Sequence, residues 1–390
     1  MLIFLQILFV ISILSFFFIN KRYGIKIFLL LILFSMFLFP SVSIKNARHG
    51  YELWVSVIIS SLLPFFILND LMIYFEIPDA LFHLFSKPFE ILFKTSGYGA
   101  YVFILSIFSG YPTGAKIVSQ LISEKKISEY EGQKILNFAS TSGPLFVVGA
   151  VGAGMLKNEI AGYVVFISHI LGAIANGILY SFFYKRTSKN IFNFKNKNEK
   201  TKNIFYSAIT NSLLTTGLIG GYIIFFSVII GIFKHIKLFT MLTFLLSKFL
   251  PGKLPEILIL LFQSIIEISN GCNIIATSNL SLEMILILEC FIISFSGVSI
   301  IMQAVTILHD CKINIKNYII SKFSHALLSS IICYILLKIR LFNSISVSNF
   351  NNIHIPNKFI LIQLMLIIIL FSLLIYRIKA YYKTIKLMRK

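Results

Sequence analysis

The stretch Ser109-Gly110-Tyr111-Pro112-Thr113-Gly114-Ala115-Lys116 lies at the end of a long apolar run, Thr95–Ala115. A proline and two glycines placed so close together cannot continue a regular helix cheaply. In lipid, the backbone groups that such a break frees need polar partners, so broken helices occur where protein or a water-filled cavity surrounds them. The stretch therefore predicts a broken helix within a membrane protein, with its helix ends directed into a cavity.

The composition of the whole chain agrees with a membrane location. Of its 390 residues, 57% are hydrophobic and 13% are charged, and the mean hydropathy is +0.88. Soluble globular domains carry about 25% charged residues, so this chain has too little polar surface for water. We expect an all-α fold, a polytopic integral membrane helical bundle with broken or re-entrant helices.

The formal net charge of +20 would suggest nucleic-acid binding in a soluble protein. Here sixteen basic residues lie beside apolar runs, in Lys21–Lys26, Lys185–Lys202 and Arg377–Lys390, and these segments contain one acid, Glu199. Positive charge next to membrane spans sets orientation and attracts anionic lipid. We therefore expect membrane lipids, and no nucleic acid, as the partners of this charge.

The basic segments Lys185–Asn203 and Arg377–Lys390 are predicted to be cytoplasmic, because positively charged loops stay on that side. A single cysteine introduced by Lys195→Cys should react with an impermeant thiol reagent only from the cytoplasmic side. Labelling from the outside alone would contradict this topology.

Apolar runs of spanning length recur along the chain, and we expect about eight to eleven spans. The runs are Leu2–Ile19, Ile27–Ile44, Leu53–Asn69, Thr95–Ala115, Ile135–Leu156, Ile160–Tyr184, Ile204–Phe233, Ile257–Thr277, Leu282–Leu308, Ile319–Leu337 and Phe359–Tyr376. Two further segments are expected to be short or surface helices, Leu238–Leu250 and Ile77–Phe93.

The polar, basic linker divides the chain. The expected organisation is N-terminal transmembrane helices over 1–50, a first half over 51–184, the linker over 185–203, a second half over 204–340, and a C-terminal helix with a basic tail over 341–390. Phe108-Ser109-Gly110 and Phe295-Ser296-Gly297 resemble each other across the halves. An inverted repeat and chance similarity both explain this, and paired broken segments are typical of transporters built from repeats.

A second break is predicted at Thr141-Ser142-Gly143-Pro144, where the proline can start a helix that Thr141 or Ser142 caps. Close packing of helices explains these small residues as well. Two breaks within 35 residues favour a shared site, and we expect Ser109–Gly114 and Thr141–Pro144 to meet around a cavity near mid-membrane.

Ionisable residues inside spans are costly and mark candidate functional sites. Lys116 and Glu267 are the main candidates, either as ligand contacts or as partners of each other, and Glu267 opens a third polar break that includes Asn270. Asp70, at the end of an apolar run, is expected to be an interfacial cap. Gln303 would be the counterpart of Lys116 in the second half, or a hydrogen bond between helices.

The remaining patterns exclude most enzyme classes. The scattered cysteines form no CxxC pair, and the histidines have no metal-ligand spacing, although His169 and His325 lie within spans. The Gly110–Lys116 stretch fails the P-loop pattern, because Gly110 and Gly114 are too close and Ala115 precedes Lys116. We expect no enzyme activity, no catalytic residues, no cofactor and no metal.

Two motifs carry a family resemblance. Ser109–Lys116 and Ser140-Thr141-Ser142-Gly143-Pro144-Leu145-Phe146 resemble the signatures of the YlbJ-type sporulation integral membrane proteins, over roughly residues 50–340. The resemblance implies nucleoside-recognition (Gate) domains and a role in endospore formation, as an exporter of dipicolinic acid through the outer forespore membrane. The second half is less glycine-rich than the family pattern.

The resulting expectation is a transporter of a small anionic solute, most readily dipicolinic acid, in the cell membrane or the outer forespore membrane. A nucleoside or nucleobase transporter and a membrane scaffold for spore-envelope (cortex) assembly are the alternatives, and a homo-oligomer or sporulation membrane partners are left open. Lys116 would neutralise a substrate carboxylate, while the breaks donate backbone N–H groups. The candidate binding residues are Ser109, Gly110, Tyr111, Pro112, Thr113, Gly114, Lys116, Thr141, Ser142, Gly143, Pro144, Glu267, Asn270 and Gln303.

Overall fold

A computed structural model describes residues 2–14, 21–75, 77–184 and 203–339, and these residues form helices and connections without a strand. The first half contains α1 (Leu2–Leu14), α2 (Lys21–Leu38), α3 (Pro40–Leu53), the π-helix η2 (Trp54–Ile59), α4 (Ser60–Tyr74), α5 (Ile77–Phe93), α6 (Tyr98–Ser109), α7 (Thr113–Ser123), α8 (Glu129–Leu136), the π-helix η3 (Leu145–Met155) and α9 (Glu159–Ser181). The second half contains α10 (Ile204–His235), α11 (Leu238–Ser247), α12 (Leu254–Ile266), α13 (Ile268–Ala276), α14 (Leu282–Phe295), α15 (Gly297–Ile307) and α16 (Ile315–Lys338). The predicted all-α membrane fold is confirmed.

Local sequence explains where several helices start. Each of four helices begins after a serine or asparagine whose side chain accepts a hydrogen bond from a backbone N–H two or three positions into the helix, the usual N-cap. These caps are Ser128, Asn158, Ser281 and Asn314.

Among the described residues, the helices that could span a membrane are fewer than the eight to eleven spans expected. In the described part of the chain, four helices are long and apolar enough to cross a membrane, or up to six if two bent pairs each count as one span. The expectation of eight to eleven was too high because several apolar runs are broken: Thr95–Ala115 divides at Gly110, and Ile257–Thr277 divides at Glu267. The run Phe359–Tyr376, the tail and residues 185–202 of the linker lie outside the described residues.

Both short segments singled out in the sequence are helices. The structure forms α5 over Ile77–Phe93, as predicted, and bends sharply, by 89°, between the end of α5 and α6. The ten-residue α11 is too short to span a bilayer alone.

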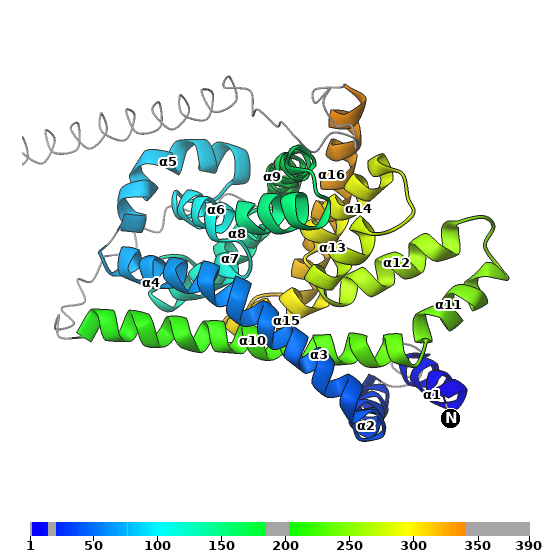
Figure 1. Cartoon of the computed structure of the whole chain (residues 1–390). Coiled ribbons are helices and arrows are strands. Elements are labelled where there is room, and N and C mark those ends of the chain that lie inside the picture. The colour runs from blue at the N-terminus through cyan, green and yellow to red at the C-terminus, as the bar shows by residue number, and fades with distance from the viewer. Residues whose placement is uncertain (1, 15–20, 76, 185–202, 340–390) are drawn as a thin grey trace, which may run out of the picture.

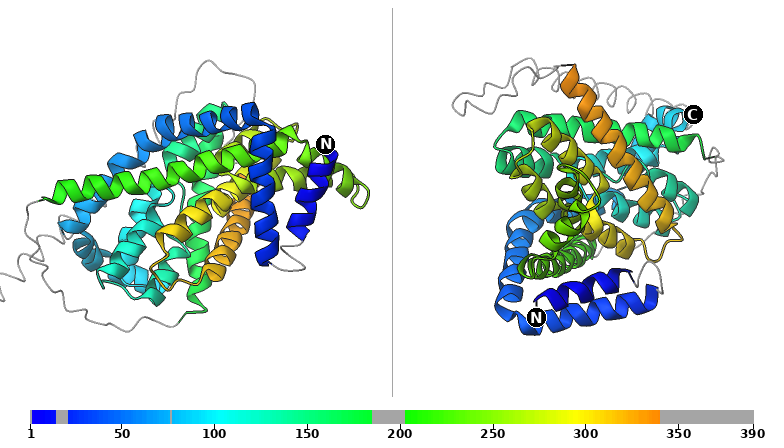
Figure 2. Two further views of the ribbon diagram at one scale, coloured as in Figure 1. Left: turned by 90° about the horizontal axis from the view of Figure 1, so that it is seen from below. Right: turned by 90° about the vertical axis from the view of Figure 1, so that its right-hand side faces the viewer.

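Two groups of packed helices, one around α10 and one around α16, organise the bundle. The 32-residue α10 crosses α3 and lies beside it and α4, and α1 packs against α2 at one end (Figures 1 and 2). At the centre, α9 packs against α16, which in turn packs against α14.

The element order reveals an internal repeat with one constant spacing. Each half contains two broken helix pairs followed by one long helix. In the first half these are α6/α7, α8/η3 and α9, and in the second half they are α12/α13, α14/α15 and α16. His169 and His325 are 156 residues apart, and the same interval separates Tyr111 from Glu267, Ser140 from Ser296, and the caps Asn158 and Asn314.

This spacing corrects the sequence-based pairing of the two halves. The Gly110 break corresponds to the Glu267 break, not to Phe295-Ser296-Gly297, whose counterpart is the break after Ser140. The Phe-Ser-Gly similarity misled because a glycine with positive φ stands at both helix breaks, Gly110 and Gly297, and glycine adopts that conformation at the lowest cost. Gln303 is therefore not the counterpart of Lys116. The inversion of the repeat stays a prediction.

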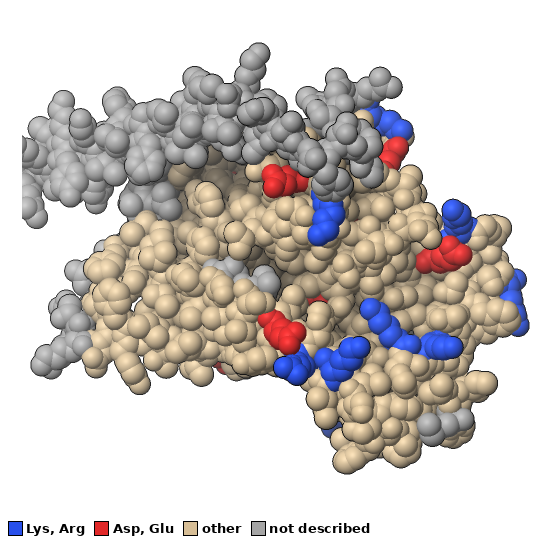
Figure 3. Space-filling model, viewed as in Figure 1, with Lys and Arg blue, Asp and Glu red and all other residues tan. Residues whose placement is uncertain are grey.

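The exterior agrees with a lipid environment. One face, shown in Figure 3, consists mainly of uncharged side chains, with Lys, Arg, Asp and Glu in small groups. Large apolar side chains such as Phe37, Phe182 and Phe249 are each at least 75% exposed. Such exposure is unusual for a protein in water but ordinary for one whose solvent is lipid.

Candidate functional site

The first break separates α6 from α7 at Gly110. Its backbone has φ +79° and ψ −169°, a conformation open essentially to glycine alone. Tyr111 follows and is buried, and its hydroxyl donates to the carbonyl oxygen of Ile293 at 3.1 Å. The first break is thereby tied to α14 of the second half.

The second break lies directly against the first. A Cβ at Gly110 would be 2.6 Å from the backbone nitrogen of Gly143, so the two segments are in backbone contact. Thr141 and Ser106 share a hydroxyl–hydroxyl bond of 3.0 Å. The predicted approach of Ser109–Gly114 to Thr141–Pro144 is present in the structure.

The second half supplies two further breaks. Glu267 is extended between α12 and α13, and its carboxylate accepts from the backbone N–H groups of Ser269 and Asn270 at 3.0 and 2.8 Å. It therefore caps α13 and places negative charge where the helix dipole favours it. Ser296, with φ +74°, separates α14 from α15.

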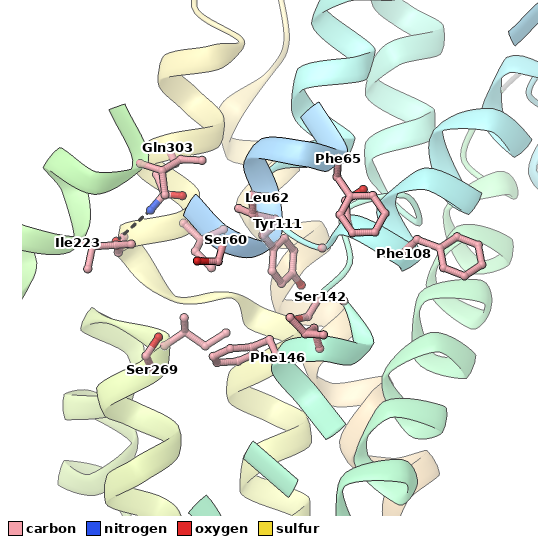
Figure 4. A pocket seen from close by; sticks show the side chains of 18 of the residues that line it. Ser60, Leu62, Phe65, Phe108, Tyr111, Ser142, Phe146, Ile223, Ser269 and Gln303 are labelled. Carbon is pink, nitrogen blue, oxygen red and sulfur yellow. Dashed lines mark hydrogen bonds between the residues drawn. The ribbon is translucent and has the colours of Figure 1, made fainter. Parts of the chain in front are cut away.

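A cavity of about 310 Å³ lies where these breaks meet, within the size range of small-molecule sites. Tyr111 and Ser142 lie on one side of it, and Ser269 and Gln303 lie on the other (Figure 4). The lining residues from the first half of the chain are Ser60, Leu62, Pro64, Phe65, Phe108, Ser109, Gly110, Tyr111, Ser142, Gly143, Leu145 and Phe146. Those from the second half are Ile219, Ile223, Glu267, Ile268, Ser269, Ser299, Ile300 and Gln303. The walls are mostly apolar, with a few polar groups.

The structure brings half of the candidate binding residues to this cavity. Those that line it are Ser109, Gly110, Tyr111, Ser142, Gly143, Glu267 and Gln303. Those that do not are Pro112, Thr113, Gly114, Lys116, Thr141, Pro144 and Asn270. Several of the second group support the first: Asn270 donates its side-chain amide to Glu267 at 3.1 Å, and Gly114 allows close contact with the backbone of Ala139.

Lys116 is held away from the cavity in a buried ion pair. Its ammonium lies 3.0 Å from a carboxylate oxygen of Asp70, and both side chains are at most 7% exposed. Gln120 donates to the same carboxylate at 2.9 Å. The expectation that Asp70 is an interfacial cap was wrong, because the residue lies inside α4 and faces the bundle. Glu267, which we considered as a partner of Lys116, instead uses its carboxylate to cap α13.

Sequence reasoning missed Lys322, a buried lysine on α16. Its ammonium donates to the hydroxyl of Tyr111 at 2.7 Å and to the carbonyl oxygen of Ser140 at 2.8 Å, so it bridges the first two breaks. The rule that flagged Lys116 also applies to a lysine in the apolar run Ile319–Leu337. The neighbouring His325, at helical spacing, was a further signal.

Both intramembrane histidines belong to the same network. The Ser142 N–H donates to Nε2 of His169 at 2.9 Å, and Nδ1 of His169 lies 2.7 Å from the hydroxyl of Ser294. His325 bonds the carbonyl oxygen of His169 at 3.0 Å, and the two rings are 4.8 Å apart. The equivalent histidines of the repeat thus meet beside the breaks.

Comparison with known proteins gives one curated relative. The chain is 28% identical over 324 residues to the sporulation integral membrane protein YlbJ of Bacillus subtilis (strain 168), covering 77% of this chain and 78% of that protein. No family model matches, and no solved structure matches. The resemblance predicted from the two glycine motifs is confirmed by this match.

Proposed function

The chain is a homologue of the YlbJ-type sporulation integral membrane proteins, and from that premise we propose that it carries a small anionic solute across a membrane during endospore formation. Dipicolinic acid, a planar aromatic dicarboxylate, is the proposed solute, and the outer forespore membrane is the proposed location. Sporulation is the role named for the relative.

The observation that carries the proposal is the cavity at which broken helices of both repeats meet. Irregular backbone inside a membrane protein is tolerated where it lines a cavity, and carriers built from repeats place their substrate at such a point. A scaffold protein would have no need of this costly arrangement. The cavity walls are apolar and include the aromatic side chains of Phe65 and Phe146. Such walls suit the faces of a planar ring.

The polar groups of the cavity favour an anion on the wall formed by the first half. The helix η3 begins beside Gly143, so its N-terminal N–H groups and dipole face this region. On the other wall, the N-terminus of α13 is already occupied by the Glu267 carboxylate. A negatively charged group would therefore lie at the Tyr111 and Ser142 side.

The direct test is uptake of labelled dipicolinate into proteoliposomes containing the purified chain. We expect uptake above that of empty liposomes, with saturation and with competition by unlabelled dipicolinate but not by nucleosides. Competition by nucleosides alone would favour the nucleoside carrier. Folded protein that moves neither class of solute would favour the scaffold.

A further inference from the structure

Lys322 is a buried lysine that has no carboxylate partner among the described residues. It is 2% exposed, and no ion pair among the described residues includes it, whereas Lys116 has Asp70. Burying a charge without a counter-ion is strongly unfavourable in general, so such a group persists where something else compensates for it.

The three acceptors around Lys322 are all neutral. They are the hydroxyl of Tyr111, the carbonyl oxygen of Ser140 and, at 3.4 Å, Nδ1 of His325. Since an ammonium has three donors and no acceptor, this set matches its charged form. The acceptors satisfy its hydrogen bonds and leave its positive charge unneutralised.

The histidine protons can be assigned from their partners. His325 directs Nε2 at a carbonyl oxygen, so its proton is there and Nδ1 is free to accept from Lys322. His169 accepts the Ser142 N–H at Nε2, so its proton is on Nδ1, toward Ser294. Both rings are neutral in this arrangement.

In the described part of the chain, α9 and α14, the helices packed against α16, offer no counter-ion to Lys322. From α9 the titratable group beside it is His169, and on α16 itself it is Tyr318, bonded to Ser140. On α14, the Glu289 carboxyl lies beside the Cys272 thiol of α13, and Glu283 pairs with Lys338 at the far end of α16. Among the described residues no carboxylate is within ion-pair distance of Lys322, so we look to the substrate for the negative charge.

We propose that Lys322 is the fixed charge that makes the cavity select an anion over a neutral molecule of the same shape. The Tyr111 hydroxyl, which accepts from Lys322 and donates to the carbonyl oxygen of Ile293, would turn its proton from that carbonyl to the substrate carboxylate. The ammonium would then act on the substrate through that hydroxyl. This inference rests on the proposed function and replaces Lys116 by Lys322 as the compensating charge. It also places the carboxylate away from Glu267.

The experiment compares binding of dipicolinate with binding of its neutral diamide to the purified full-length chain in detergent, by calorimetry. Wild type should prefer dipicolinate by about tenfold or more, as expected when a charged hydrogen-bonding group is lost. Lys322→Gln should bind the two ligands about equally, and Lys322→Arg should keep part of the preference. The control is Lys338→Gln, an exposed lysine of the same helix, which should behave as wild type.

The ratio of the two affinities separates charge selection from structural damage, since misfolding lowers both. If Lys322→Gln is not stable, Tyr111→Phe removes only the hydroxyl and should reduce the preference severalfold. A preference for dipicolinate that is unchanged in either variant would overturn the inference while leaving anion transport standing. Wild-type protein that is folded but prefers the diamide or binds only nucleosides would instead refute the proposed function.

Discussion

Replacing Lys116 by glutamine is expected to lower the free energy of unfolding by about 3–5 kcal/mol, the usual effect of removing one partner of a buried ion pair. The Asp70 carboxylate would remain buried with Gln120 as its hydrogen-bond donor. Urea or thermal unfolding of the purified protein in detergent would measure the loss.

The double substitution Lys116→Gln with Asp70→Asn should recover most of this stability, because it removes both charges. The matched control is Lys338→Gln, whose exposed ion pair with Glu283 should contribute about 0–1 kcal/mol. A Lys116→Gln protein that is as stable as wild type but no longer transports dipicolinate would instead support the direct substrate contact that the sequence suggested.

Gly110→Ala is expected to destabilise the protein by several kcal/mol and to abolish uptake. The alanine would be strained at φ +79°, at a cost of about 1–3 kcal/mol. Its Cβ would also meet the backbone nitrogen of Gly143 at 2.6 Å, and such overpacking costs about 1–3 kcal/mol more. Neither break can shift without moving residues that line the cavity.

Gly217→Ala is the control for this substitution. A Cβ there meets nothing within 4 Å, and the residue lies inside α10. It should be neutral or stabilise the helix by up to about 1 kcal/mol. Unfolding curves and uptake for both variants test the comparison, and wild-type behaviour of Gly110→Ala would show that the two breaks are not rigidly packed.

The breaks could be predicted from sequence because their cause is local. Gly110, Pro112 and Gly114 cannot continue a helix, and the same holds for Gly143-Pro144, whatever surrounds them. The apolar runs likewise fixed the all-α class. The number of spans could not be predicted in this way, since hydropathy counts a broken run such as Ile257–Thr277 as one span although its backbone turns at Glu267.

The partners of the charges could not be predicted because they depend on which helices are neighbours. Asp70 and Lys116 lie on α4 and α7, and Lys322 reaches Ser140 across 182 residues of chain. The repeat could have been found from the sequence, because Ser168-His169 and Ser324-His325 are separated by the same interval as Asn158 and Asn314. A search by equal spacing would have found it, where similarity of short motifs did not.

The broken helices also bear on how a membrane potential would act on transport. The segments α7, α13 and α15 have 11, 9 and 11 residues, so each is about 14–17 Å long, half of the roughly 30 Å hydrocarbon core. With the cavity near mid-membrane, as the sequence predicts, a solute there would have about half of the bilayer left to cross. Each uncompensated charge moved through the full potential involves about 2.3 kcal/mol per 100 mV. Carriage of the proposed dianion without an accompanying cation would therefore be a voltage-sensitive current of two charges per cycle. A fixed ammonium would help to hold the dianion in the cavity but would not change that net charge, because it does not cross with the solute.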